Sequence, residues 1–322
     1  MTEAPAVETT QLIVETTQLT KQFDDQNAVA AVNLQISPGE IYGLIGPNGA
    51  GKTTLIRMLA TIDEPTAGEI HIGGQRLIRD QANPSIKQQI GFLPDDFPLY
   101  DDLTVWDYLD YFARLYYLKE PTLTQRIQEV IELVSLEDKQ RSPIRQLSRG
   151  MKQRLSLART VIHRPTLLLL DEPVSGLDPI ARIQYRQTIK ALQRQGMTIL
   201  ISSHILSDLE DFCTAIGIME QGRLVESSQL RALYGRDSQR RIITASLGEA
   251  AALQTAVQAF DGVQVCEVLP DQKIGFAFAG TDVELAEVLR SLIQSGHAIT
   301  EFHQTQETLE DIFIKLGYQK TA

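Results

Sequence analysis

Cysteine is scarce in this sequence. Only two cysteines, Cys213 and Cys266, occur in 322 residues, and they lie far apart with no partner at a recognisable spacing. Such a pattern indicates neither a disulfide framework nor a zinc site. It is typical of a reducing compartment, so we expect a cytoplasmic protein.

Long apolar runs are also missing. No stretch approaches the roughly 18 consecutive apolar residues that a membrane-crossing helix needs. Residues 1–10 carry glutamates and threonines where a secretory signal would have a basic and then an apolar segment. We therefore expect the chain to reach a membrane only through a partner, on the cytoplasmic face.

Positive charge is in deficit. The chain has 30 lysines and arginines against 41 aspartates and glutamates, a net charge of -11, and no basic cluster stands out. This balance argues against a surface devoted to nucleic acid and against tight binding to anionic lipid. A length of 322 residues with 43% hydrophobic residues predicts about two domains with cores of useful size.

A phosphate-binding pattern is present near the N-terminal end. It fits G-x-x-x-x-G-K-[ST] and comprises Gly46, Pro47, Asn48, Gly49, Ala50, Gly51, Lys52 and Thr53. An apolar run, 40–45, precedes it and a helix-like run beginning at Thr54 follows it. The glycines allow successive N–H groups to face one concavity, and the helix N-terminus adds partial positive charge. A turn that binds nothing is the alternative, but this strand–loop–helix context favours a nucleotide site.

Candidate chemistry accompanies that loop. Lys52 is suited to reach the β- and γ-phosphates, Thr54 to contact the nucleotide and Thr53 to hold Mg2+. The apolar run 166–170 reads as a buried parallel strand and ends in Asp171 and Glu172. Asp171 is placed to hold Mg2+ through water and Glu172 to polarise an attacking water. The alternative is a carboxylate pair that only caps the strand.

His204 ends the next predicted strand, 197–202, and is suited to hydrogen-bond a γ-phosphate. A structural histidine is the alternative. Phe23 closes the first predicted strand and could stack on a nucleotide base, or it could be an ordinary core aromatic.

The predicted elements define an α/β architecture. Residues 1–13 read as a polar, flexible lead, and 14–234 as a cassette with a parallel core sheet and an antiparallel subdomain that includes strand 29–36. A helical insertion occupies about 96–164, and its aromatic face is mostly core with part available for docking. After a linker at 235–239, a β-α-β-β-α-β order over 240–318, ending in a helix at 308–316, predicts a small α+β ferredoxin-like domain.

From about residue 14 to 230, these motifs together resemble the ATP-binding cassette family. The segment 147–151 reads Leu-Ser-Arg-Gly-Met, similar to the family signature Leu-Ser-Gly-Gly-Gln. Arg149 and Met151 replace the third and fifth residues, while Ser148 and Gly150 are kept. The segment 175–178 resembles the family's D-loop.

The resemblance assigns roles to single residues. It implies that Glu172 is the catalytic base, His204 the switch histidine and Phe23 the base-stacking aromatic. Asp95 follows a predicted strand where the family usually has glutamine, and its carboxylate can approach Mg2+.

The resemblance also implies cofactors and partners. ATP and Mg2+ would be the cofactors, and two ATP would be sandwiched between two cassettes, in a homodimer or a heterodimer. Ser148 and Gly150 would complete the site of the second cassette, because a helix starting at Ser148 cannot reach its own loop 46–53 across the helical insertion. Closure with ATP and opening after hydrolysis would drive a separate membrane permease.

The C-terminal region resembles an appendage of bacterial multidrug, lipid or polysaccharide exporters, and segment 308–313 resembles its characteristic end. A dimer contact, a regulatory role and a stabilising cap all remain open for it. The main expectation is thus the ATP-hydrolysing subunit of an exporter. A soluble cassette ATPase of translation or DNA repair, a non-enzymatic nucleotide sensor and an importer subunit are the alternatives.

Overall fold

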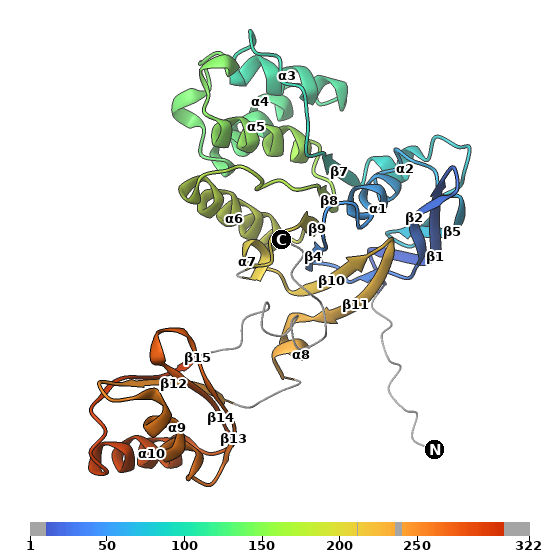
Figure 1. Ribbon diagram of the computed structural model, residues 1–322. Helices are drawn as coiled ribbons and strands as arrows, with labels where there is room; N and C mark the ends of the chain where they lie inside the picture. Colours follow the sequence, from blue (N-terminus) through green and yellow to red (C-terminus); the bar gives the residue numbers. More distant parts are fainter. Residues whose placement is uncertain (1–10, 211, 236–239, 306–322) are drawn as a thin grey trace, which may run out of the picture. The chain divides into compact units, whose positions relative to one another are not determined.

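The computed structural model describes residues 11–210, 212–235 and 240–305. Its contacts divide the chain into two units, Met1–Leu230 and Arg231–Ala322, and each unit has its own hydrophobic core. Figure 1 shows the elements of each unit. Across the described ranges, every helix is too short or too polar to cross a membrane.

A six-stranded sheet forms the centre of the first unit. Its strands follow the order β11-β10-β4-β9-β8-β7, and every neighbouring pair is parallel except β10 with the edge strand β11. The strands are β4 (Ile41–Ile45), β7 (Ile90–Leu93), β8 (Leu167–Leu170), β9 (Thr198–Ser203), β10 (Ala215–Glu220) and β11 (Arg223–Gln229). Strands β4, β8 and β9 are buried throughout, as expected for parallel strands covered on both faces.

A second, antiparallel sheet lies beside the first. Its order is β2-β1-β5-β6, with β3 also paired to β1. The strands are β1 (Val14–Phe23), β2 (Gln26–Val32), β3 (Gln35–Ile36), β5 (Ala67–Ile72) and β6 (Gln75–Arg76).

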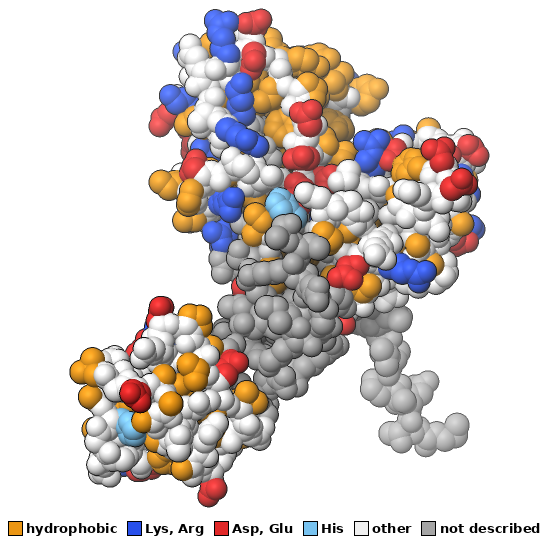
Figure 2. All heavy atoms as spheres, in the orientation of Figure 1, with side chains coloured by type: hydrophobic (Ala, Val, Ile, Leu, Met, Phe, Trp, Pro, Cys, Tyr) orange, Lys and Arg blue, Asp and Glu red, His pale blue; other side chains and the backbone are white. Residues whose placement is uncertain are grey.

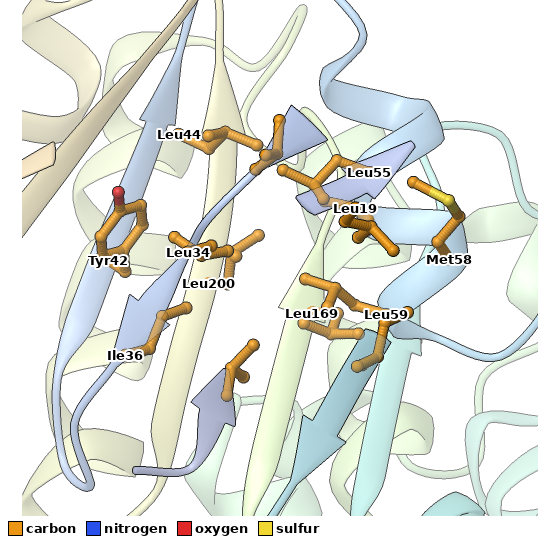
Figure 3. Packing of buried hydrophobic residues seen from close by; sticks show 14 of the residues in the cluster. Leu19, Leu34, Ile36, Tyr42, Leu44, Leu55, Met58, Leu59, Leu169 and Leu200 are labelled. Atoms are coloured by element: carbon orange, nitrogen blue, oxygen red, sulfur yellow. The ribbon is translucent and has the colours of Figure 1, made fainter. Parts of the chain in front are cut away.

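Helix α1 (Lys52–Leu59) packs between the two sheets. Its buried side chains, Leu55, Met58 and Leu59 among them, pack in one cluster with Leu19 of the antiparallel sheet and Leu169 of the parallel sheet (Figure 3). Because the phosphate-binding pattern directly precedes α1, this core fixes the start of the helix relative to both sheets.

The remaining helices of the first unit lie around the parallel sheet and in the helical insertion (Figure 1). They are α2 (Pro84–Lys87), α3 (Val105–Leu115), α4 (Thr122–Leu133), α5 (Arg149–Val161), α6 (Pro179–Arg194) and α7 (Ser207–Glu210), and α8 (Leu230–Gly235) follows β11. Helices α3, α5 and α6 begin at Thr104, Ser148 and Asp178, whose side chains accept a backbone N–H of the first turn.

The second unit has a βαββαβ order with two helices on a four-stranded antiparallel sheet. Its elements are β12 (Arg240–Ser246), α9 (Ala250–Gln258), β13 (Val263–Val268), β14 (Ile274–Phe278), α10 (Asp282–Gln294) and β15 (Ile299–Thr305). The strand order β13-β14-β12-β15 is that of a ferredoxin-like sheet. Phe276 and Phe278 pack with Leu253 of α9 and Leu292 of α10 in its core.

One predicted strand, 29–36, is divided in two. Strand β2 ends at Val32 and β3 is only Gln35–Ile36. Between them the Asn33 Oδ1 accepts the Gln18 N–H at 2.7 Å, and the Thr16 hydroxyl accepts the Leu34 N–H at 2.8 Å. Side chains thus replace the backbone partners there, which periodicity alone does not reveal. The predicted helix 308–316 lies outside the described residues.

Leu169 offers a test of the core. Truncation of this fully buried residue of β8 by Leu169→Ala should lower the free energy of unfolding by about 2–5 kcal/mol, because it leaves a cavity between the sheet and α1. Ile180→Ala, at a position that is 70% exposed, should change it by no more than about 0.5 kcal/mol. Urea unfolding followed by circular dichroism measures both, and equal losses would contradict this account of the core.

Candidate nucleotide-binding and hydrolytic site

The loop 46–52 joins β4 to α1 and passes close to two other strands. A Cβ on Gly46 would lie 2.3 Å from the Met219 carbonyl oxygen of β10, and a Cβ on Gly51 would lie 2.2 Å from the Ala28 oxygen of β2. Gly51 also has φ 99° and Gly49 φ 80°, which side chains disfavour. The two close approaches explain why the loop needs glycine at both positions.

One side of this loop is open to solvent. Pro47, Asn48 and Gly49 are exposed, whereas Ala50 is buried. Helix α1 has no side-chain cap at Gly51 and no acidic residue in its first turn, so its N-terminal N–H groups and helix dipole are available to an anion. Thr53 is exposed on that first turn, and Thr54 is half-buried.

Lys52 bends back under the loop. Its side chain is only 5% exposed, and Nζ donates to the Gly46 carbonyl oxygen at 2.6 Å and the Pro47 oxygen at 3.2 Å. The same Nζ lies 3.4 Å from Glu172 Oε1. The structure therefore brings Lys52 and Glu172 together although they lie far apart in the sequence.

Glu172 also contacts His204. Its Oε2 lies 2.8 Å from His204 Nδ1, and its side chain is largely buried. Glu172 has φ 48°, in the left-handed region, so the backbone turns sharply just after β8. That turn explains how two consecutive residues, Asp171 and Glu172, can both serve the same end of the sheet.

Ser202 of β9 positions both carboxylate residues. Its Oγ donates to Asp171 Oδ1 at 2.7 Å and accepts the Glu172 N–H at 2.9 Å. Asp171 is 2% exposed, so this bond satisfies a charged group that has lost most of its water. The sequence analysis missed Ser202; a serine in the otherwise apolar stretch before His204 was the available signal.

Asp95 belongs to the same electrostatic cluster. Burial raises the pKa of the Asp95 carboxyl, and the negative charges of Asp171, Glu172 and Asp96 raise it further, against an opposing effect of Arg149. Within the described residues, no three acidic, histidine or cysteine side chains lie close enough to hold a metal ion by themselves. Carboxylate and hydroxyl oxygens are nevertheless the hard donors that suit Mg2+ bound together with phosphates.

Phe23 lies at the end of β1 and is 50% exposed, with Lys21 Nζ 5.0 Å from the centre of its ring. It pairs with Gln26 in the β1–β2 hairpin, and β2 is the strand whose Ala28 carbonyl meets Gly51. The ring is thus not part of the core, and it lies on the hairpin whose second strand contacts the loop.

Ser148 and Gly150 begin α5. Ser148 is exposed and its Oγ accepts the Met151 N–H at 3.3 Å. Gly150 is buried against α6, so closely that a Cβ added to it would lie 2.8 Å from Ala181 Cβ. Within the described ranges, the hydrogen bonds of Ser148 stay within α5 and none joins it to the loop 46–53.

A strand–loop–helix phosphate site with an adjacent carboxylate and histidine defines a P-loop nucleotide-hydrolysing fold. The family model described as "ABC transporter" matches residues 29–175. The uncharacterised ABC transporter ATP-binding protein YcbN of Bacillus subtilis is 35% identical, with 94% of this chain and 96% of the relative covered.

Two further relatives have names that describe a transport or resistance role. The bacitracin transport ATP-binding protein BcrA of Bacillus licheniformis is 33% identical (94% of this chain and 97% of the relative covered). The linearmycin resistance ATP-binding protein LnrL of Bacillus subtilis is 30% identical (92% and 95%). A solved dimer of the cassette MJ0796 bound to ADP and Pi has a TM-score of 0.61 and 26% identity, with 68% of this chain and 99% of that chain covered.

This chain belongs to the ABC transporter ATP-binding proteins. The predictions of a P-loop cassette fold, of an exporter-type ATP-binding subunit and of ATPase activity coupled to transport are confirmed, and the protein binds nucleotide. The comparisons do not favour the alternative in translation or DNA repair.

Ser202 can be tested by removal of its hydroxyl. We expect Ser202→Ala to lower the free energy of unfolding by about 1–3 kcal/mol and to lower kcat for ATP, because Asp171 and the Glu172 N–H each lose a buried partner. Ser203→Ala is the matched control, since among the described residues the Ser203 hydroxyl bonds within its own turn, to Ile205. Thermal unfolding and steady-state ATPase assays measure the two effects, and equal behaviour of the variants would exclude a special role for Ser202.

Proposed function

We propose that two copies of this chain close around two ATP molecules and use their hydrolysis to drive export through a separate membrane permease. The observation that carries the proposal is the contact sequence Lys52–Glu172–His204, which joins the phosphate loop to the ends of two parallel strands. All three side chains converge at the edge of the sheet where the loop begins.

In this proposal the loop 46–53 and Thr54 bind the phosphates, Phe23 stacks on the base and Lys52 neutralises phosphate charge. Glu172 orients and accepts a proton from the attacking water, while His204 holds the γ-phosphate and Glu172 in register. Asp171, Asp95 and Thr53 would hold Mg2+, which offsets the negative charge of the transferred phosphoryl group when it is bound.

A second copy supplies the missing part of each site. One chain carries the loop, the catalytic carboxylate and Ser148, so two identical chains suffice for two complete sites. The first turn of α5 contains no acidic residue, and Ser148 and the backbone N–H of Gly150 lie there. This positive helix end suits a phosphate bound by the other chain. A heterodimer with a related cassette is the competing outcome.

The permease would contact the helical insertion. Hydrophobic side chains gather over α3 in Figure 2, and the exposed residues there include Tyr111, Leu115 and Tyr117. An apolar patch of this kind is typical of a protein–protein contact, and it would hold the chain at the cytoplasmic face of the membrane.

We assign residues 14–234 to the ATPase cassette, with the helical subdomain at about 96–164, and 240–318 to an appended domain that contacts its copy or regulates it. The names of two relatives, for bacitracin transport and linearmycin resistance, support export of a toxic compound by this chain's complex. The transported molecule is selected by the permease.

Substitution of Glu172 should separate ATP binding from ATP hydrolysis. We expect Glu172→Gln to lower the ATPase rate by about a hundredfold or more, since the general base is lost, and to accumulate an ATP-bound dimer. Lys52→Ala should lose both hydrolysis and dimer formation. Gel filtration with ATP and a phosphate-release assay measure these effects. Hydrolysis at the normal rate by Glu172→Gln would reopen the nucleotide-sensor alternative.

Ser148 tests the two-chain site. An arginine at this exposed position would block closure sterically, so Ser148→Arg should abolish hydrolysis while the monomer still binds a fluorescent ATP analogue. Thr122→Arg adds the same side chain at the exposed start of α4 and should leave both properties unchanged. Normal hydrolysis by Ser148→Arg would refute a site shared between two chains.

A further inference from the structure

The start of α5 is attached at two points to the segment that follows β8. Arg149 Nη2 donates to the Ser175 carbonyl oxygen at 3.1 Å. The next residue, Gly150, packs so closely on Ala181 of α6 that a Cβ there would lie 2.8 Å from the Ala181 Cβ. The first turn of α5 therefore moves with the segment 171–181 unless these contacts break.

Arg149 is placed in an unusual way for a cation. It is the first residue of α5, where the positive end of the helix dipole disfavours positive charge, and the first turn has no acidic residue to compensate. Its guanidinium lies over Gly176, where an added Cβ would come within 2.6–2.7 Å of three guanidinium atoms. Gly176 has φ 65°, so its backbone also favours glycine. Arginine and glycine fit each other here.

Two successive hydrogen bonds connect Arg149 to Glu172. Arg149 donates to the Ser175 carbonyl, and the Ser175 N–H donates to the Glu172 carbonyl at 3.1 Å. The Glu172 side chain contacts Lys52 and His204. On the other side, Arg149 directly follows Ser148 in the chain.

We propose that Arg149 is a positioning residue that couples the two ATP sites of the dimer. Glu172 acts on the ATP bound by its own chain, whereas Ser148 contacts the ATP bound by the partner chain. Arg149 connects the loop after Glu172 to Ser148. The inference rests on the two-chain site proposed above. ATP draws Lys52 away from Glu172, the turn 172–175 adjusts, and the bond from Arg149 passes the adjustment to the first turn of α5. A glycine at 149 would lack the bond to Ser175 and keep the packing of Gly150 on Ala181.

The test uses the full-length chain. Arg149→Ala keeps a good helix former at the first position of α5 but removes the bond to Ser175. Arg145→Ala is the matched control, because Arg145 lies just before Ser148, is exposed and pairs with exposed Asp102. ATPase rate is measured against ATP concentration for each variant, and binding of a fluorescent ATP analogue to the monomer gives Kd.

For the parent chain and Arg145→Ala we expect a Hill coefficient of about 2, the limit for two coupled sites. For Arg149→Ala we expect a Hill coefficient clearly below that of the parent, with Kd changed less than about twofold, because dimer closure still links the sites but the bond from Arg149 does not. Arg149→Lys should restore part of the cooperativity, since its ammonium can donate to the same carbonyl.

The outcomes separate the two proposals. If Glu172→Gln fails to dimerise with ATP, the site built from two copies is wrong and the coupling falls with it. If that dimer forms but Arg149→Ala keeps the parent's Hill coefficient, or the parent itself shows a coefficient of about 1, only the role of Arg149 is overturned. A fall in Hill coefficient that occurs equally in Arg145→Ala would also overturn it, because loss of charge alone would then explain the result.

Discussion

The carboxylate of Glu172 is the group on which the site depends. One of its oxygens lies near the ammonium of Lys52 and the other near the ring of His204, while its backbone N–H bonds to Ser202. These partners come from the phosphate loop and the end of β9. A carboxylate held from several sides in a largely buried place cannot turn freely, so the base is already oriented before a nucleotide arrives.

The sequence predicted the parts of this site that are local. The loop 46–53 carries its own backbone geometry, and the apolar run before Asp171 ends where the parallel strand ends. Contacts between segments that lie far apart in the chain were harder to predict from the sequence. The role of Ser202 depends on the pairing of β8 with β9, which sets the serine beside Asp171, and no spacing in the sequence encodes that register.

The same holds for the fold: elements with a clear local pattern were predicted from the sequence, and others were not. Elements with a strong pattern were found within a few residues of their ends; the strand expected from 197 to 202, for example, spans Thr198–Ser203. The division of strand 29–36 was missed, because the side chains of Thr16 and Asn33 take over backbone bonds there. The short helices α2 and α7 were missed as well, since four residues give too little pattern for a helical period.

The packing of Arg149 on Gly176 has an evolutionary consequence. The guanidinium occupies the space that a side chain at 176 would need, so such a side chain would displace the end of Arg149 from its present place. Because Gly176 also has φ 65°, its backbone disfavours a larger residue at 176 whatever residue stands at 149. Variation at this pair should therefore fall on position 149, while glycine is retained at 176.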